Sequence, residues 1–581
     1  MPHAPARGAI FGSRFVRHLS RLVGVYWRSP DAPWGMFLLA VAIVFELWTV
    51  WGSVRVADAE REILDALAGR EAPAFLGAVA VFLTVTMLYL FSSAYRIYIR
   101  QALEIRWRRA LTSYYVNRWI GPHAYIQPEL HPEVDNPDQR IQEDVRDFVA
   151  SALGLSLSLL AAIVTLASFG GLLWSLSEDF PVQVGEGRHF HVPGSMLWVA
   201  VIYGLLSMWI THRVGRRLVP INFDRLRFEA DFRYGLTRFR DNAEAVALSR
   251  GEEVERGGAI DRFQGIIRNW WDLIRAQRTL TLVTGAIGQA NNVVPVLVAA
   301  PAYFAGTITL GTIVQIRIAY GQVSGALAWF VFAYQEIARW RANVERLSTL
   351  SETMRETERR FAEAPLRVET TADGVLRLDG LRLEEPNGRV LLDDASARVE
   401  TGERLAITGP SGTGKTLLLR AIAGIWPFGA GRIQVPGGVR MMFVTQRPYV
   451  PIGTLRAAAS YPAPEGSFAD GQIQEAFRSL GLGGLEGSLD SAAPWAQILS
   501  PHEQQRLALV RVLLHKPDWI LLDKSTSALD EESERRVYAL LTEQLPGATL
   551  LSIAHRAGVE QYHSRRWSLA PRDGRVVLEA A

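Results

Sequence analysis

Six long apolar segments, separated by charged connections, constrain the fold of this chain more than any other feature. Most of them approach or exceed the roughly 20 residues that a helix needs to cross a bilayer, although the fourth is short. They lie at Trp34–Val54, Phe75–Tyr95, Val149–Trp174, Met196–Thr211, Leu280–Ala305 and Ile308–Ile337. Buried helices of a large soluble protein are the alternative, and the distribution of charge argues against it.

Arginine clusters follow the second, fourth and sixth segments, whereas the other connections are more acidic or very short. Because positively charged loops stay in the cytoplasm, this alternation predicts that the N-terminus and the region after the sixth span are both cytoplasmic. The first thirty residues are basic and lack the short apolar core of a removable signal peptide, so we expect residues 1–30 to be a cytoplasmic N-terminal segment.

The remaining chain divides by composition. The whole chain is 49% hydrophobic and 21% charged, a mixture typical of an apolar membrane half joined to a soluble half. We expect an all-α transmembrane domain of six helices over residues 31–345, a linker over 346–374 and a second domain over 375–581. In the last region strands alternate with helices, which predicts an α/β fold. Long charged connections without helix breakers predict helices that extend beyond the bilayer.

Two classes of function are disfavoured by composition. The chain has no cysteine, which excludes disulfides, thiolate metal sites and cysteine nucleophiles. Its net charge of +3 gives no general field for nucleic acid, so we expect no nucleic-acid partner.

A glycine-rich turn between a strand and a helix carries the clearest chemistry. The sequence GPSGTGKT matches a phosphate-binding loop, whose backbone N–H groups and helix N-terminus hold a polyphosphate. In this pattern the lysine reaches the β- and γ-phosphates and the threonine binds magnesium. The predicted binding residues are Gly409, Pro410, Ser411, Gly412, Thr413, Gly414, Lys415 and Thr416.

A second motif supports the first. Asp523 ends the apolar strand WILLD, and a carboxylate in this position holds the magnesium of a bound nucleotide, through water. Apolar runs that end in aspartate are common, so this motif alone is weak, and it becomes informative beside the loop. We therefore predict that a nucleoside triphosphate and Mg²⁺ bind here, and the resemblance described below implies that the nucleotide is ATP.

Between these motifs, LSPHEQQR predicts a sharply started helix. Ser500 is suited to the N-cap, Pro501 to the first helical position, and Glu503 completes a capping box. A helix that starts in this way can face an anion with its N-terminus, or it is simply a well-capped helix.

The order of the motifs resembles that of ATP-binding cassette (ABC) transporters. LSPHEQQR is similar to the cassette signature, SALD at 527–530 to the D-loop, Gln446 to the Q-loop glutamine and His555 to the switch histidine. The resemblance implies that Gln446 also contacts the metal, and that Ser500, His502 and Glu503 contact nucleotide. In that family two cassettes meet head to tail, so a second copy of this chain is the partner that we expect.

Three further stretches resemble the SbmA/BacA peptide-uptake family and its cassette-fused relatives. These relatives include the mycobacterial transporter of hydrophilic solutes and cobalamin and, more distantly, the peroxisomal D subfamily. The stretches are Asp135–Val145, Glu229–Glu255 and Ile308–Phe330. The resemblance implies an exporter-like ABC fold in the bacterial inner membrane that imports peptides or other hydrophilic solutes. The first two stretches are predicted to include helices that press on the cassette; solvated long helices are the alternative.

Three residues depart from the family pattern. Lys524 stands where a glutamate would activate the attacking water, and a lysine cation cannot accept that proton. His502 replaces a glycine of the signature, and Glu385 precedes Pro386 where relatives often have an aromatic residue for adenine. We predict that His555, Gln446 and Lys524 occupy the catalytic positions and that hydrolysis is slow or absent.

Polar residues inside the apolar segments are candidates for a transport pathway, because such residues are costly in a membrane. The ionisable ones, Glu46 and Arg317, predict a water-filled cavity, and Glu46 is also a candidate proton carrier. Hydrogen bonding between helices is an equal alternative for the amides. The candidates are Glu46, Asn291, Asn292, Gln315, Arg317 and Gln322.

We therefore expect an ATP-linked homodimeric transporter, embedded in membrane lipid, that imports peptides or other hydrophilic solutes. A proton-driven carrier with a regulatory cassette is one alternative, and an exporter of acyl lipids or drugs is another.

Overall fold

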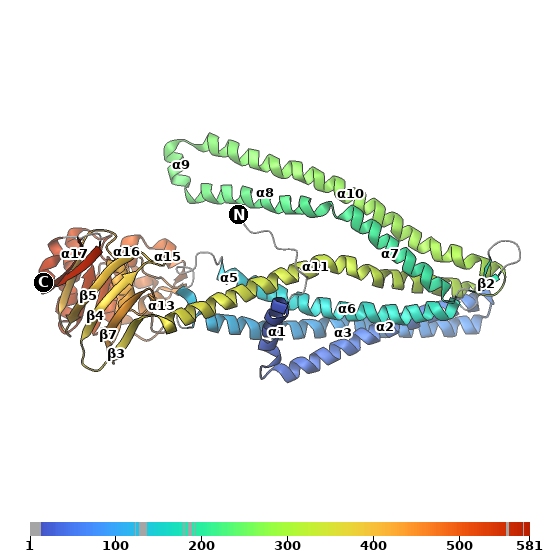
Figure 1. Ribbon diagram of the computed structural model, residues 1–581, viewed down its shortest axis with the longest axis horizontal. Coiled ribbons are helices and arrows are strands. Elements are labelled where there is room, and N and C mark those ends of the chain that lie inside the picture. Colours follow the sequence, from blue (N-terminus) through green and yellow to red (C-terminus); the bar gives the residue numbers. More distant parts are fainter. Residues whose placement is uncertain are drawn as a thin grey trace. The chain divides into compact units, whose positions relative to one another are not determined.

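The computed structural model describes residues 13–121, 124–126, 136–177, 181–183, 189–191, 193–553, 557–572 and 575–580. The chain forms two compact units (Figure 1). The first contains residues 1–117 and 136–350, and the second contains 118–135 and 351–581. Each is described by itself.

The first unit is built from long helices. Short β1 (Pro181–Gln183) and β2 (His189–His191) pair antiparallel between α6 and α7. A π-helical turn, η2 (Arg140–Asp144), leads into α6. The helices, some of which continue into the second unit, are α1 (Ser13–Trp27), α2 (Ala32–Ala68), α3 (Ala72–Trp119), α5 (Pro137–Gln139), α6 (Val145–Leu176), α7 (Ser195–Gly215), α8 (Leu218–Asp241), α9 (Ala243–Ser249), α10 (Glu252–Phe304) and α11 (Leu310–Glu363).

Five helical stretches of the described chain are long and apolar enough to cross a membrane, rather than the six that we predicted. They are Ala32–Ala68, Ala72–Trp119, Pro137–Leu176, Ser195–Asp241 and Glu252–Phe304. The sixth segment lies within α11, a continuous helix of 54 residues, which is not in this set. The set covers described residues only, and the side chains at 330–332 and 335 of α11 lie outside them. The count of six is therefore not confirmed.

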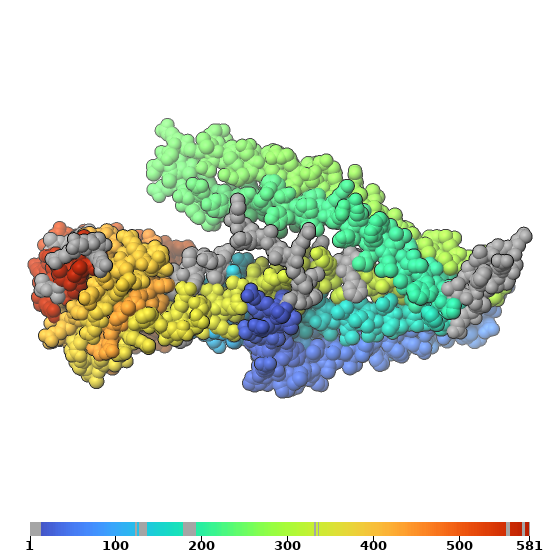
Figure 2. All heavy atoms as spheres, viewed as in Figure 1, coloured from blue at the N-terminus to red at the C-terminus, as the bar shows by residue number. Residues whose placement is uncertain are grey.

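The helices continue well past the apolar segments, as predicted. The connection between the fourth and fifth segments forms the hairpin of α8, α9 and α10, and α8 has no buried residue. In Figure 2 this hairpin stands clear of the neighbouring part of α11. The stretch Glu229–Glu255 therefore makes up its exposed tip.

The stretch Asp135–Val145 has a different environment where it is described, from Asn136 onward. Asp144 is buried, and its two carboxylate oxygens accept hydrogen bonds of 2.6 and 2.8 Å from Arg346 of α11. Arg140 also donates to the Arg346 carbonyl at 3.2 Å. A bidentate arginine–carboxylate pair fixes both distance and orientation, so this contact fastens the start of α6 to α11.

Small and branched apolar side chains pack α2, α6, α7, α10 and α11 together. The core of this bundle includes Ala57, Phe169, Ala200, Ala299 and Ile316, each essentially inaccessible to solvent. Small residues allow helix backbones to approach closely, which is the usual way in which helices associate inside a membrane.

The second unit has the α/β architecture that the sequence predicted. A six-stranded sheet has the order β14-β13-β6-β12-β11-β8, in which all neighbours except β13 and β14 are parallel. A four-stranded sheet has the order β3-β7-β4-β5. Short β9 (Gly453–Thr454) and β10 (Ala492–Ala493) pair separately. The main strands are β3 (Leu366–Thr371), β4 (Leu376–Glu384), β5 (Val390–Val399), β6 (Arg404–Thr408), β7 (Gly429–Pro436), β8 (Met441–Val444), β11 (Trp519–Asp523), β12 (Thr549–Ile553), β13 (Arg565–Arg572) and β14 (Arg575–Ala580).

Helices complete this unit in two groups. One group packs with both sheets around Trp519 and Trp567, and the other packs against β8, β11 and β12 around Phe477 and Leu509. Residues 351–363, expected as part of a linker, are the end of α11, and β3 follows directly. The helices are α12 (Lys415–Ile422), α13 (Leu455–Ser460), α14 (Asp470–Ser479), α15 (Trp495–Ile498), α16 (Pro501–His515) and α17 (Glu531–Gln544), with shorter helical turns η1 (Ala124–Ile126), η4 (Gly483–Ser488) and η5 (Ala557–Tyr562).

Candidate nucleotide site and membrane cavity

The predicted phosphate loop follows β6, at the carboxyl edge of the parallel strands, where ligands of open α/β sheets bind. Three of its glycines, Gly409, Gly412 and Gly414, have φ angles of 137°, 83° and 88°. A Cβ atom on Gly409 would lie 2.4 Å from the carbonyl oxygen of Leu569. Glycine is therefore required at 409 by both conformation and space.

Lys415 is the first residue of α12 and is only 4% exposed. Its ammonium group donates hydrogen bonds of 2.7 and 2.6 Å to the carbonyls of Gly409 and Pro410. Burial, and then the positive charge of Lys524, lower the pKa of Lys415, while Asp523 opposes them. Backbone carbonyls of the loop therefore hold the lysine in place. The same loop is the predicted binding site for phosphate.

The three predicted magnesium ligands line one cavity. The hydroxyl of Thr416 donates to Asp523 Oδ1 at 3.1 Å, and Gln446 lines the same cavity of about 1140 Å³. A hydroxyl, a carboxylate and a carboxamide form a set of hard oxygen donors, which fits Mg²⁺. When bound, the ion would neutralise phosphate charge. Tyr125 and Ile126 of η1 also line this cavity.

Lys524 lies beside this machinery, half-buried, immediately after β11. Its φ angle of 51° is in the left-handed region, which few residues other than glycine adopt. Its carbonyl accepts a hydrogen bond from the Ser527 amide at 3.1 Å. Its positive charge contributes to the lowered pKa of Lys415. The site therefore contains two ammonium groups near the predicted phosphate position.

The signature helix begins as predicted. Ser500 is the N-cap of α16, Pro501 is at the first turn, and Ser500 and Glu503 form a reciprocal capping box. The backbone amide and the hydroxyl of Ser500 each donate a hydrogen bond to the carboxylate of Glu503, and these two bonds lower the pKa of Glu503. Ser500 and His502 are exposed and do not line the cavity that contains Thr416. The chain thus brings together the loop, Asp523 and Gln446, but not the signature.

One residue that the sequence reasoning missed connects three motifs. Gln505 of α16 is 3% exposed. Its Nε2 donates to the carbonyl of Gln446 at 3.0 Å, and its Oε1 accepts from the Ala528 amide at 3.1 Å. Its position in LSPHEQQR was the only signal available, since its partners are distant in sequence.

Of two other positions singled out from the sequence, His555 and Glu385, the structure describes only the second. His555 lies outside the described residues. Glu385 lies in the turn between β4 and β5, where its carboxylate accepts a hydrogen bond of 3.2 Å from Asn387.

In the first unit, two candidate pathway residues are paired. Glu46 is 5% exposed, and its carboxylate lies 2.9 Å from Arg96 of α3. Gln315 is 1% exposed and lies between two charged side chains of α2. It donates to Asp58 at 2.7 Å and accepts from Arg61 at 3.3 Å. These contacts join α2 to its neighbours.

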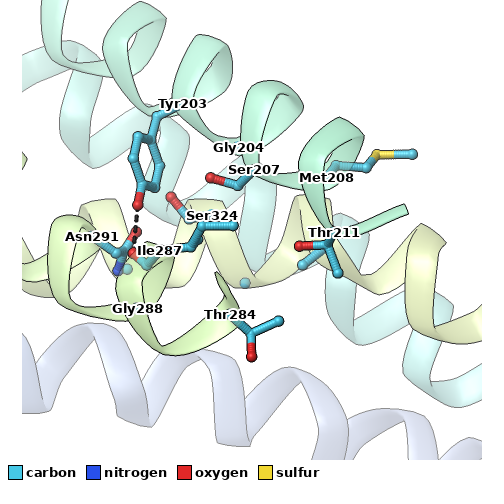
Figure 3. A pocket seen from close by; sticks show the side chains of 13 residues that line it. Tyr203, Gly204, Ser207, Met208, Thr211, Thr284, Ile287, Gly288, Asn291 and Ser324 are labelled. Carbon is cyan, nitrogen blue, oxygen red and sulfur yellow. Dashed lines mark hydrogen bonds between the residues drawn. The ribbon is translucent and has the colours of Figure 1, made fainter. Parts of the chain in front are cut away.

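Of the other candidates, Asn291 lines a cavity of about 280 Å³ between α7, α10 and α11 (Figure 3). Asn292 donates to the Gly288 carbonyl at 3.3 Å and is exposed, Gln322 is exposed, and Arg317 is half-buried. None of these three lines the cavity. The structure therefore brings one of the six predicted pathway residues to this cavity.

Comparison with protein families gives two matches. Residues 30–304 match the model of the ABC transporter transmembrane region 2, and residues 392–527 match the ABC transporter model. The chain is 34% identical to an uncharacterized ABC transporter ATP-binding protein of Synechocystis, over 93% of this chain and 82% of the relative. It is 30% identical to the inner membrane ABC transporter ATP-binding protein YddA of Escherichia coli, over 94% and 95%. The lysosomal cobalamin transporter ABCD4 of the mouse is 26% identical, over 95% and 93%.

A solved structure supports the fold. The chain superimposes on a bacterial Atm1-family ABC exporter with ATP bound, with a TM-score of 0.68 at 17% identity. The match covers 93% of this chain and 94% of the other.

Proposed function

Because the chain belongs to the ABC transporter family, we propose that it forms a homodimer in the bacterial inner membrane and imports peptides or other hydrophilic solutes, with ATP acting mainly by binding. In this proposal the cassette and the N-terminus are cytoplasmic, and α11 is the sixth span.

The observation that carries the nucleotide part is the pair of lysines. Lys524 stands after Asp523 and is close enough to Lys415 to depress its pKa. A cation at this position favours bound γ-phosphate but cannot take a proton from water. ATP binding therefore remains strong while hydrolysis is slow.

The exposed signature supports the dimer. Ser500 and His502 begin a capped helix, are exposed, and do not line the cavity that contains Thr416 and Asp523. A second copy, placed head to tail, supplies its own signature to this cavity. Such an interface is reciprocal, so both nucleotide sites would carry Lys524.

Polar groups in the membrane helices support hydrophilic cargo. The carboxamide of Asn291 and several hydroxyls line a cavity between α11 and two helices that are apolar enough to span a bilayer, α7 and α10. The resemblance to the SbmA/BacA family supports peptide uptake rather than export.

Glu46 favours a second candidate, a proton-driven carrier whose cassette is regulatory. It is an acidic side chain inside the first span, and its ion pair with Arg96 would have to open for it to carry a proton.

Uptake of labelled tri-alanine into vesicles, with and without ATP and a proton gradient, tests these proposals. We expect ATP-dependent uptake that Lys415→Ala abolishes, and Lys516→Ala, an exposed lysine outside the site, is the control. Uptake that survives Lys415→Ala but needs the proton gradient selects the second candidate.

ATPase activity tests the role of Lys524 separately. A general base contributes roughly 10²- to 10⁴-fold, so Lys524→Glu should raise the rate at least about a hundredfold. Rapid hydrolysis by the wild type that Lys524→Glu leaves unchanged would show that this part of the proposal is wrong.

A further inference from the structure

The cavity between α7, α10 and α11 contains polar atoms that the protein does not satisfy. Asn291 Oδ1 and Ser324 Oγ are buried and have no hydrogen-bond partner among the described residues. A buried polar atom without a partner is costly, so few are retained in native proteins. Eighteen such side-chain atoms occur among the described residues, and two of them lie at this one cavity, where a ligand could provide the missing bonds.

Two other hydroxyls of the cavity have hydrogen-bond partners in the protein. Tyr203 donates its hydroxyl hydrogen to the carbonyl of Ile287 (Figure 3). Thr284 donates to the Leu280 carbonyl at 2.9 Å. In Figure 3 the side chains of Ser207 and Ser324 extend into the space between the helices. The unused hydrogen-bonding capacity is therefore concentrated at Asn291 and Ser324.

The lining excludes charge. Among the described residues that line it there is no acidic or basic side chain, and the remaining members are small or apolar, such as Met208 and Ala328. An ionised group would lose its hydration without a counter-ion, which costs far more than burying a neutral polar group. The cavity thus fits a neutral group with hydrogen-bonding atoms.

Glycines create the space. An added Cβ on Gly288 or Gly325 would meet no atom within 4 Å, and on Gly321 the nearest atom is Asn291 Nδ2 at 3.6 Å. The volume of about 280 Å³ is nearly twice that of a cavity of about 150 Å³ that accommodates benzene. A short peptide segment has this size.

We propose that this cavity binds an uncharged peptide group of the cargo. A peptide group has one N–H donor and one carbonyl acceptor. The N–H donates to Asn291 Oδ1, and the carbonyl accepts from the hydroxyl of Ser324. The inference rests on the proposed transport of peptides and assigns the part of the peptide that is recognised, which is the backbone rather than its charged ends.

Binding of tritiated N-acetyl-alanyl-alanine methylamide to the full chain in lipid nanodiscs tests the site. We expect saturable binding that Asn291→Leu and Ser324→Ala each weaken roughly tenfold. The analogue with an ester oxygen in place of the central N–H should bind more weakly by a similar factor, because it lacks the donor.

Filling the cavity gives a second test that does not depend on a single hydrogen bond. Gly288→Leu should abolish binding of the capped dipeptide. Gly285→Leu is the matched control, since Gly285 lies three residues earlier on α10, outside the lining, and an added Cβ also meets no atom within 4 Å. Equal binding to the wild type and Gly288→Leu, or equal binding of dipeptide and ester, would overturn the inference.

Uptake of tri-alanine separates this inference from the proposed function. If Gly288→Leu vesicles import the peptide as well as the wild type, the cavity is not a cargo site, although transport stands. If the wild type imports none but Gly288→Leu still removes binding of the capped dipeptide, the site stands and the proposed function is wrong.

Discussion

The nucleotide site and the membrane cavity differ in whether their buried polar groups have hydrogen-bond partners. In the nucleotide site, Lys415, Thr416 and Gln505 all have hydrogen-bond partners before any ligand is bound. In the cavity, Asn291 Oδ1 and Ser324 Oγ have none among the described residues. A paired network is rigid and selects one geometry, whereas unpaired groups can accept ligands that differ in shape. The first arrangement suits a single nucleotide, and the second suits a class of related cargoes.

The ion pair of Glu46 and Arg96 is one of the paired contacts inside the membrane unit, and breaking it should have the largest effect. Arg96→Leu leaves a buried carboxylate without a partner, which typically costs about 3–5 kcal/mol. We expect the thermal denaturation midpoint in detergent to fall by several degrees. Replacing both residues with leucine should recover most of the loss. The exposed pair of Arg339 and Glu336 is the control, and breaking it should change stability by less than about 1 kcal/mol.

Gln505→Leu tests the paired network of the cassette. It leaves the carbonyl of Gln446 and the amide of Ala528 without this partner, at about 1–3 kcal/mol for each group that stays buried. We expect a lower denaturation midpoint and weaker binding of a fluorescent ATP analogue. Gln497→Leu, at an exposed position, should change neither. Equal effects of the two substitutions would contradict a connecting role for Gln505.

The cassette should also lose stability in mild acid. Burial lowers the pKa of His563, whose ring nitrogens contact the carbonyl of Val559 and the hydroxyl of Ser552. The neutral form is thus favoured in the folded state. Its stabilisation is complete above the unfolded pKa of about 6.5 and declines as pH falls towards the folded pKa, by at most about 1.4 kcal/mol per pH unit. The denaturation midpoint should drop more between pH 7.5 and 5.5 for the wild type than for His563→Gln.

Ser324→Ala should have the smallest effect on stability, within about 0.5 kcal/mol, because no described residue is a partner of the lost hydroxyl. The denaturation midpoint in the absence of cargo measures this effect. A decrease as large as that of Gln505→Leu would remove the contrast between the two regions.

Local patterns were sufficient to predict much of the second unit. The strand ending at Asp523, the loop before Lys415 and the capping box of Ser500 and Glu503 each depend on neighbouring residues, and all three are present. The helix after the loop has eight residues and ends at Ile422.

Contacts between distant segments could not be predicted. Arg96 is 50 residues from Glu46, and the two contacts of Gln505 span 59 and 23 residues. The sequence identified Glu46 and Gln315 as unusual because they are polar in an apolar segment, but it did not reveal their partners. For Asn291 it left cargo contact and helix bonding open, and only the packing of α7, α10 and α11 shows a cavity there.

The burial of Lys415 has a practical consequence for chemical labelling. The chain has only three lysines, at 415, 516 and 524. Lys516 is exposed and Lys524 half-buried, whereas Lys415 is enclosed by its own loop. A mild acylating reagent should therefore modify 516 and 524 before 415. In a Lys516→Arg background, Lys524 becomes the preferred lysine for a reporter group, and its protection by nucleotide can be followed directly by mass spectrometry.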